Sequence, residues 1–157
     1  MSYLLASDTL HGASGKAFVT IDGKVCELFG AKNISTNMNL SAAEMKVVGT
    51  KKAQEKPGAA KLTGKMTVYY GTPLFLDMAA QYIRTGTMPS FALQVANDDE
   101  AAAIGAQTVA YYGCRLSGDV PLSLLDAEAD MLTMELSFSF EDFEVLSAFH
   151  DPENLGV

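Results

Sequence analysis

The residues best suited to carry out chemistry are three consecutive acids, Asp98, Asp99 and Glu100, which lie between two segments with strand-like periodicity. Such a cluster could hold a divalent cation, serve as an acid/base pair, or form a solvated turn. A calcium loop of the EF-hand type needs ligands at alternating positions and a closing glutamate about twelve residues along. Residues 101–107 contribute only the amide of Gln107. The sequence therefore favours a polar turn, with a calcium-dependent domain as an alternative.

Other catalytic arrangements find little support. The two histidines, His11 and His150, stand near the ends of the chain, which disfavours a histidine-based triad or a zinc site. The segment HGASGK resembles a phosphate-binding loop only loosely, because a hairpin pattern follows it instead of a helix. Cys26 and Cys114 are far apart without a CxxC partner and are predicted to be buried, reduced thiols. We therefore predict a protein that is not an enzyme and uses no cofactor.

The composition is typical of one folded domain spanning residues 1–157. The chain is 48% hydrophobic and carries a net charge of −8. No apolar run approaches the ~20 residues of a membrane helix, and the first residues lack the basic and apolar regions of a signal peptide. The acidic balance also disfavours general nucleic-acid binding, which ordinarily uses a basic patch.

The charges are distributed unevenly along the chain. Residues 1–96 hold ten of the eleven basic side chains, and six of those eleven fall between Lys46 and Lys65. Residues 97–157 hold thirteen of the nineteen acids and only Arg115 against them. The asymmetry is compatible with solvated charges, or with a head-to-tail interface between copies. Candidates for such an interface are Lys51, Lys52, Lys56, Asp98, Asp99 and Glu100.

Most segments alternate with period two, as strands do. In GKAFVTIDGKVCELFG, Asp22-Gly23 predicts a tight hairpin that pairs Val19 with Cys26. One helix is expected at about residues 73–85, with Thr72 as its N-cap and Gly86 as its left-handed stop. Residues 50–61 are expected to form an extended charged loop with its tip at Pro57-Gly58.

Two segments have sharply polar faces. In the first, around residues 33–40, Asn and Ser side chains alternate with apolar ones. In the second, the apolar residues from Leu132 to Phe140 are expected to face inward, and the polar residues that alternate with them are expected to face outward. A break in phase near Glu141-Asp142 predicts a bulge that bends this strand between two sheets. The polar faces suit bulk solvent or a wetted wall inside an assembly. Their residues are Asn33, Ser35, Asn37, Asn39, Thr133, Glu135, Ser137, Ser139 and Glu141.

These elements predict a mainly β fold, in which two packed sheets form a sandwich or partial barrel with one flanking helix. Three segments carry a family resemblance: KLTGKMTVYYGTPLF, AAQYIRTGTMPSFALQVANDDEAAAIGAQTVAYYGC and LLDAEADMLTMELSFSFEDFEVL. Taken in order, they resemble the XkdM-like tail tube proteins of contractile-tailed phages, PBSX-type prophages and R-type bacteriocins. The resemblance covers roughly residues 14–149. Residues 1–14 match nothing in it and are expected to form a flexible arm.

The resemblance implies the tail tube fold, which is related to the Hcp tubes of type VI secretion. It implies hexameric rings that stack head to tail inside a contractile sheath, with a hollow lumen for DNA or effectors. The implied partners are further copies of the chain and the sheath, tape-measure, baseplate and terminator proteins; no membrane is involved. The implied location is the virion tail or a tail-like particle, after synthesis in the bacterial host cytoplasm.

On this interpretation the two polar faces line the lumen, or alternatively face the sheath. An acidic, hydroxyl-rich wall would repel phosphates, so that DNA passes without specific binding. Two other functions remain open: an Hcp-like secretion tube subunit, and a small-ligand-binding β-barrel. The barrel would need a closed apolar cavity within one subunit.

Overall fold

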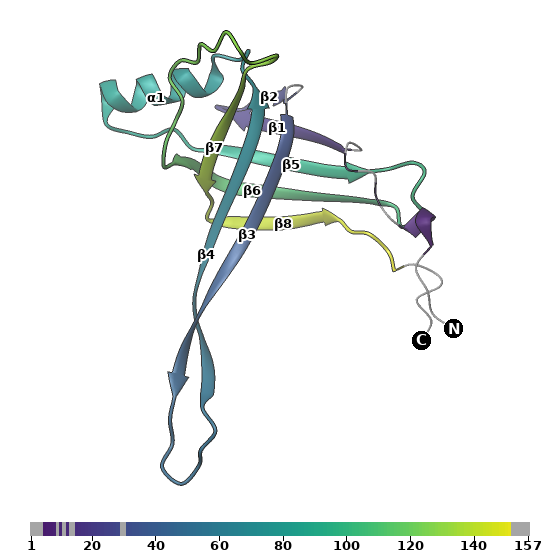
Figure 1. The fold of residues 1–157 in the computed structure, drawn as a ribbon, viewed down its shortest axis with the longest axis vertical. Coiled ribbons are helices and arrows are strands. Elements are labelled where there is room, and N and C mark those ends of the chain that lie inside the picture. The colour runs from purple at the N-terminus through teal and green to yellow at the C-terminus, as the bar shows by residue number, and fades with distance from the viewer. Residues whose placement is uncertain (1–4, 9, 11, 13–14, 29–30, 152–157) are drawn as a thin grey trace.

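The computed structural model describes residues 5–8, 10, 12, 15–28 and 31–151 (Figure 1). The expected amino-terminal arm at 1–14 lies largely outside the described residues. The part that is described includes the short 3-10 helix η1 (Ala6–Asp8), where the Ser7 carbonyl accepts a hydrogen bond from the Ala103 N–H at 2.6 Å. The remaining elements are β1 Gly15–Ile21, β2 Lys24–Glu27, β3 Ala31–Met45, β4 Gln54–Tyr69, α1 Leu74–Thr85, β5 Phe91–Asp98, β6 Ala106–Ser117, β7 Thr133–Ser139 and β8 Asp142–Ser147.

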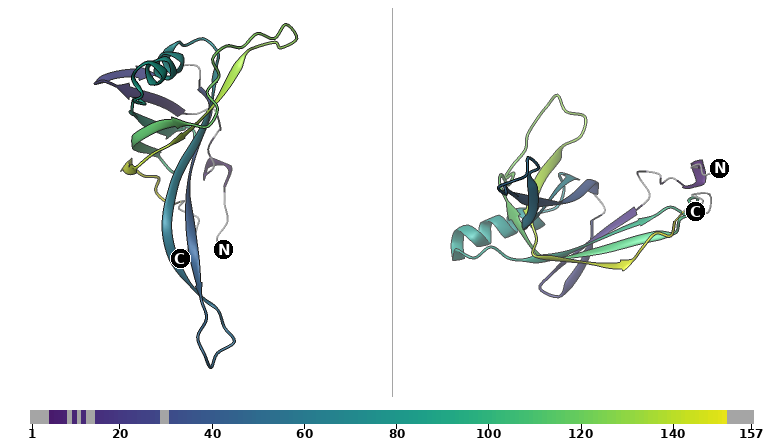
Figure 2. Two further views of the ribbon diagram at one scale, coloured as in Figure 1. Left: turned by 90° about the vertical axis from the view of Figure 1, so that its left-hand side faces the viewer. Right: turned by 90° about the horizontal axis from the view of Figure 1, so that it is seen from below.

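The mainly β prediction is confirmed, but the strands form one antiparallel sheet with two walls. The strand order is β2-β1-β5-β6-β7-β4-β3, and β8 also pairs with β6. Strand β6 joins the walls because residues 106–114 pair with β5 and residues 108–112 pair with β8, whereas residues 115–117 pair with β7. Gly113, with φ 66°, lies just before the change of partner, at an irregularity in the pairing of β6 with β5, and there the strand bends. Figure 2 shows the two walls crossing at a steep angle. Among the described residues the sheet ends at β2 and β3 and does not close into a barrel.

The first hairpin forms as predicted. Asp22 and Gly23 adopt φ values of 51° and 78°, and Val19 pairs with Cys26. The prediction that both cysteines are buried is wrong for Cys26, which is exposed, whereas Cys114 is buried. The reason is the position of β2 at the end of the sheet, beyond the core.

Helix α1 begins one residue later than predicted. Its N-cap is Pro73, without a side-chain capping bond, although the Thr72 hydroxyl accepts a hydrogen bond from the Leu74 N–H at 3.3 Å. Gly86 ends the helix in the left-handed conformation with φ 75°, as expected. Phe75 and Met78 are buried, so the helix packs its apolar face on the sheet. No helix in the described part of the chain has the length and apolar character needed to cross a membrane.

Strands β3 and β4 form one long hairpin that projects from the rest of the molecule (Figure 1). The extended loop predicted at 50–61 is therefore wrong for residues 54–61, which belong to β4. Pro57-Gly58 does not form the tip, because Pro57 pairs with Ala42 and Gly58 lies with Ala59 in a bulge opposite Ser41. A Cβ on Gly58 would lie 2.5 Å from Ser41 Oγ and 3.2 Å from the Ser41 carbonyl oxygen, so a larger residue here would require Ser41 to shift. The true turn includes Gly49, whose φ is 97°.

The predicted break near Glu141-Asp142 is confirmed. Strand β7 ends at Ser139 and pairs with β4, and β8 begins at Asp142 and pairs with the other wall through β6. The predicted inward residues of β7 are buried, and Phe138 is 0% exposed. Its ring lies over Gly64 of β4, a position where a Cβ would meet the ring carbons.

The core fills the angle between the two walls and the helix. The buried cluster consists of Val19, Met66, Val68, Phe75, Met78, Phe91, Leu93, Cys114, Leu116, Met134, Leu136, Phe138 and Phe140. Across the same angle, Thr36 Oγ1 and the Tyr111 hydroxyl are hydrogen-bonded at 2.8 Å. Tyr111 also packs edge-on against Phe140, with ring centroids 4.9 Å apart. These contacts fix the wall of β3, β4 and β7 against the wall of β5, β6 and β8.

Candidate functional site

The predicted polar residues of β3 and β7 share a single face, because both strands pair with β4. The cross-strand rows are Asn33–Thr67–Glu135, Ser35–Lys65–Ser137 and Asn37–Thr63–Ser139, continued by Asn39–Lys61 and Tyr69–Thr133. Directly opposed residues in an antiparallel sheet point to the same side. We call this surface the polar face.

The other side of the same strands is the protein core. Here the rows are Ile34–Met66–Leu136 and Thr36–Gly64–Phe138. Met66, Leu136 and Phe138 are at most 1% exposed, whereas the four predicted residues of β3 are all exposed. Over these rows the wall has one buried and one exposed side, as the alternation in sequence predicts; farther along the hairpin, Met38 and Leu40 lie on the core-facing side but are exposed.

The end of β6 extends the polar face by one strand. Arg115 pairs with Ser139 and Ser117 pairs with Ser137, so both side chains join the existing rows. Glu141 lies in the connection between β7 and β8, where its carboxylate accepts a hydrogen bond from Arg115 at 3.1 Å. Both side chains of this ion pair are more than half exposed, at 53% and 67%, so the pair contributes little to stability.

Sequence reasoning missed the central strand of this face. Thr63, Lys65 and Thr67 alternate with the apolar residues of β4, and that alternation was visible in KLTGKMTVYY. Their presence corrects the hypothesis of an acidic wall. Lys61, Lys65 and Arg115 share the face with Glu135 and the adjoining Glu141. The polar face is thus rich in amides and hydroxyls, with charges of both signs.

The three consecutive acids form a turn between β5 and β6. Asp98 still pairs with Ala106, and Asp99 Oδ1 accepts a hydrogen bond from the Ala101 N–H at 3.0 Å. The Asp99 carbonyl also accepts one from the Ala102 N–H at 2.9 Å. A carboxylate that bonds its own backbone two residues on is the hallmark of an Asx turn. In the described ranges no three potential metal ligands gather at one point; His11 lies outside those ranges.

The lysine candidates lie elsewhere. Lys51 and Lys52 occupy the connection at the tip of the β3–β4 hairpin, and Lys56 lies in β4 close to it. Figure 1 shows this tip well away from the turn between β5 and β6. Within one copy the structure therefore does not bring the basic and the acidic candidates together.

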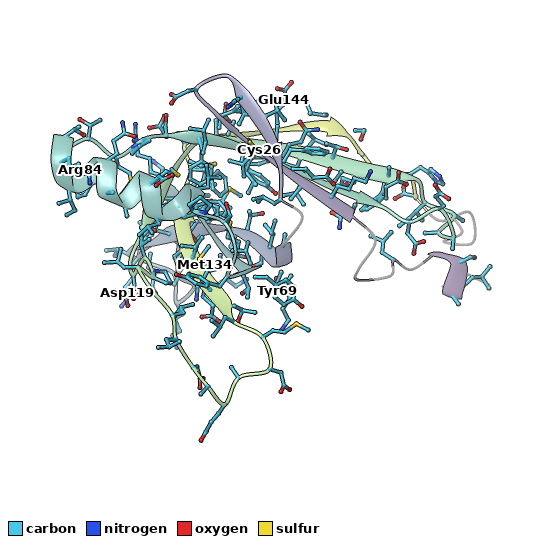
Figure 3. All side chains as sticks on the ribbon, turned by 90° about the horizontal axis from the view of Figure 1, so that it is seen from above. Cys26, Tyr69, Arg84, Asp119, Met134 and Glu144 are labelled. Carbon is cyan, nitrogen blue, oxygen red and sulfur yellow. The ribbon has the colours of Figure 1, made fainter. Side chains whose placement is uncertain are left out.

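Cys114 does not have the environment of a nucleophile. Burial raises the pKa of the Cys114 thiol to about 11 from an ordinary 9.0, so this thiol stays protonated at neutral pH. Cys26 is exposed at the edge of the sheet (Figure 3). In the other wall, the hydrogen bond from the Tyr112 hydroxyl to Glu144, 3.2 Å long, raises the pKa of that phenol.

The described residues border at least two cavities that open to solvent. One of about 620 Å³ is bordered by the starts of β1 and β3 and the end of β5, and charged residues such as Lys16, Glu27 and Lys32 line it. The other, of about 290 Å³, lies beside the start of α1. The larger one is not the closed apolar cavity that a small-ligand-binding barrel requires.

The protein leaves many large apolar side chains uncovered. They include Met38, Leu40, Val47, Val48, Ile83, Leu122, Leu125, Met131, Phe143, Val145 and Leu146. Strand β8 is exposed along its whole length. Extensive apolar exposure over several elements is typical of subunits that bury these surfaces against other chains.

The chain is similar in sequence to known proteins. A family model described as phage tail tube protein (DUF2001) matches residues 2–147. The chain is 29% identical to the phage-like element PBSX protein XkdM of Bacillus subtilis strain 168, over 94% of this chain and 97% of that protein. It is 30% identical to the uncharacterized protein YqbM of the same strain, over 90% of this chain and 93% of that protein.

Solved structures share the fold at low sequence identity. A chain of the PVC extracellular contractile injection system, in its sheath–tube complex, has a TM-score of 0.66 at 12% identity and covers 89% of this chain and 93% of its own length. A chain of the anti-feeding prophage cap has the same TM-score and identity, with 93% and 96% covered. The family model describes structural proteins of phage tails, in agreement with the prediction that the chain is not an enzyme. Because that model spans nearly the whole chain, this protein belongs to the phage tail tube protein family.

Proposed function

We propose that this chain is the repeating subunit of a tail tube in which hexameric rings stack head to tail and the polar face lines the lumen. The observation that carries the proposal is the single wet face spanning parts of β3, β4, β7 and β6, backed by the core on its other side. A water-filled channel needs such a wall. The six-fold symmetrised anti-feeding prophage baseplate contains a chain of similar fold, which supports hexameric symmetry here.

The mixed charge of the polar face suits a lumen through which DNA or an effector passes without being bound. Lys61, Lys65 and Arg115 would attract phosphates, and Glu135 and Glu141 would repel them. Neutral amides and hydroxyls separate these charges. DNA or an effector moving through the lumen would therefore meet no continuous patch of one sign.

The free edges of the sheet support closure into rings. Strand β3 is fifteen residues long and ends the strand order with one side unpaired. An exposed edge of that length is a template for pairing with another chain. Pairing around a ring would close the polar walls of six copies into one inner barrel, which removes the free edges.

The remaining assignments extend the same proposal. The outer surface of the tube would contact a contractile sheath, and the tube ends would contact tape-measure, baseplate and terminator proteins. Lys51, Lys52, Lys56, Asp98, Asp99 and Glu100 stay candidates for contacts between subunits. The particle would assemble in the bacterial host cytoplasm and carry the protein in its tail. Family membership favours a phage or tail-like particle over a type VI secretion tube.

Thiol labelling of assembled tubes tests which way the polar face points. In a Cys26→Ser background, Asn37→Cys would place a thiol on the polar face, and Ile83→Cys would place one on the exposed side of α1. We expect a small maleimide to label both variants, and a maleimide carrying a long polymer to label only Ile83→Cys. Equal labelling of Asn37→Cys by the long reagent would place the face outside, toward the sheath. Failure of the native protein to form rings or tubes at high concentration, seen by negative-stain microscopy, would remove the proposal altogether.

A further inference from the structure

We propose that the tip of the β3–β4 hairpin of one copy docks on the β6–β7 connection and the adjoining end of α1 in the next copy along the tube. This inference rests on the proposed head-to-tail stacking and names its contact. We call residues 46–56 the basic tip and residues 118–132 the acidic loop.

The two segments lie at opposite ends of the molecule. Figure 1 places the basic tip at the lower end of the longest axis and the acidic loop at the upper end, and the side view in Figure 2 agrees. They cannot meet within one copy. In a head-to-tail stack along this axis, the lower end of each copy faces the upper end of the next, which makes the contact heterologous and extensible.

The charges of the two segments are complementary. The basic tip holds four lysines and one acid, namely Lys46, Lys51, Lys52, Lys56 and Glu55. The acidic loop has no basic residue and four acids, namely Asp119, Asp126, Glu128 and Asp130. Opposed potentials of this kind guide encounter and select the correct partner. The uneven charge along the sequence thus becomes a separation of charge between the two ends of the fold.

Apolar groups accompany the charges at both ends. Val48 is fully exposed at the tip and Val47 is 46% exposed, although both are aliphatic. In the acidic loop, Leu122 is 61% exposed and Leu125 is 98% exposed. Uncovered aliphatic side chains beside charged ones are typical of an interface with an apolar centre and a polar rim.

A cavity at the receiving end has the size and lining for such a tip. Its volume is about 290 Å³, and its lining is Tyr70, Gly71, Thr72, Pro73, Leu76, Pro121, Leu122 and Met134. Figure 3 looks onto this end and shows Asp119 at the start of the acidic loop and Met134 in the neighbouring strand β7. Val47 and Val48 would enter the cavity while the tip lysines pair with the acids of the loop.

The turn at Asp98, Asp99 and Glu100 is the competing acidic partner. Figure 1 places it at the side of the molecule, at the far end of β5, rather than at an end of the longest axis. It also lies next to segments from both chain ends: the Ser7 carbonyl bonds the Ala103 N–H, and the Ile104 carbonyl bonds the His150 N–H at 3.0 Å. An axial stack favours the acidic loop over this turn.

Disulfide trapping distinguishes the two partners. The test chain carries Val48→Cys and Leu122→Cys in a Cys26→Ser background, because Cys26 is exposed and would cross-link on its own. Any disulfide between the new thiols must join two copies. We expect mild oxidation of tubes to give a ladder of dimers, trimers and longer chains on a non-reducing gel. Val48→Cys with Asp99→Cys is the matched control and should give no ladder.

Charge reversal supplies an independent readout. Lys51→Glu with Lys52→Glu should lower the amount of sedimenting tube at least tenfold at low salt, with rings still present. Adding Asp126→Lys and Asp130→Lys to the same chain should restore tubes, whereas adding Asp98→Lys and Asp99→Lys should not. Tubes that form without a Val48–Leu122 ladder, or rescue by the Asp98 and Asp99 changes instead, would overturn the docking but leave the tube function intact. If the native protein forms no rings or tubes, the proposed function fails and the docking fails with it.

Discussion

Gly64→Ala is the sharpest test of the packing that separates the polar face from the core. A Cβ on Gly64 would lie 2.8 and 2.9 Å from two ring carbons of Phe138 and closer still to a third. The ring is 0% exposed and packs against Phe91 and Phe140, with centroids 6.1 and 6.2 Å away, so it has little room to shift. Overpacking of a core costs about 1–3 kcal/mol. The lower backbone entropy of alanine offsets about 0.5–1 kcal/mol of this.

The clash therefore dominates, and we expect Gly64→Ala to lower the free energy of unfolding by about 1–2 kcal/mol. In a domain of this size the change corresponds to a fall in Tm of about 2–8 °C. Urea and thermal unfolding should be measured on protein that sediments as single copies, so that assembly does not contribute. Gly71→Ala is the matched control, because a Cβ there meets nothing within 4 Å and Gly71 is not among the glycines with positive φ.

A double-mutant cycle isolates the ring as the cause. Phe138→Leu removes the ring carbons that the new methyl would meet, so Gly64→Ala should cost much less in that background. If Gly64→Ala behaves like Gly71→Ala, or costs as much with leucine at 138 as with phenylalanine, then the close approach of β4 to the ring does not constrain this wall.

Three further outcomes follow from the exposure of the two cysteines, from the pKa of Cys114 and from the first hairpin. One thiol per native chain, that of Cys26, should react rapidly with a disulfide reagent, and Cys114 should react only on unfolding. Because the pKa of Cys114 is raised from 9.0 to about 11, the unfolded chain loses this proton first. The free energy of unfolding should then fall as pH rises between those values, and a flat pH profile would contradict burial of the thiol. Gly23→Ala should cost about 1 kcal/mol through its φ of 78° alone, since a Cβ there meets no neighbour; an unchanged urea midpoint would argue against the predicted turn.

Local signals in the sequence predict the local structure well. The Asp22-Gly23 turn, the alternation of Met134, Leu136 and Phe138, and the left-handed stop at Gly86 each follow from neighbouring residues. These features depend on backbone conformation and on side-chain period, and both are written into short stretches of chain.

The predictions from sequence fail where the structure of a segment depends on its pairing with residues distant in sequence. Pro57-Gly58 has the composition of a turn, yet Pro57 pairs with Ala42 and a bulge opposite Ser41 keeps Gly58 in the strand. The charge of the polar face depends on pairing between β4 and β7, which brings Lys65 beside Ser137. Cys26 has the pattern of a buried residue, but its strand lies at the edge of the sheet. None of these three features can be deduced from the local periodicity of apolar and polar residues.

Strand β6 has a consequence for how the chain folds. Its first part completes one wall and its last three paired residues complete the other, so neither wall has all its strands until residues far apart in sequence have met. Contacts of such high sequence separation slow the folding of β proteins. They also couple the two walls, so that a cut at the Gly113 bend should abolish both together instead of releasing one as an independent unit. A newly made copy would then present either no docking surfaces or all of them at once.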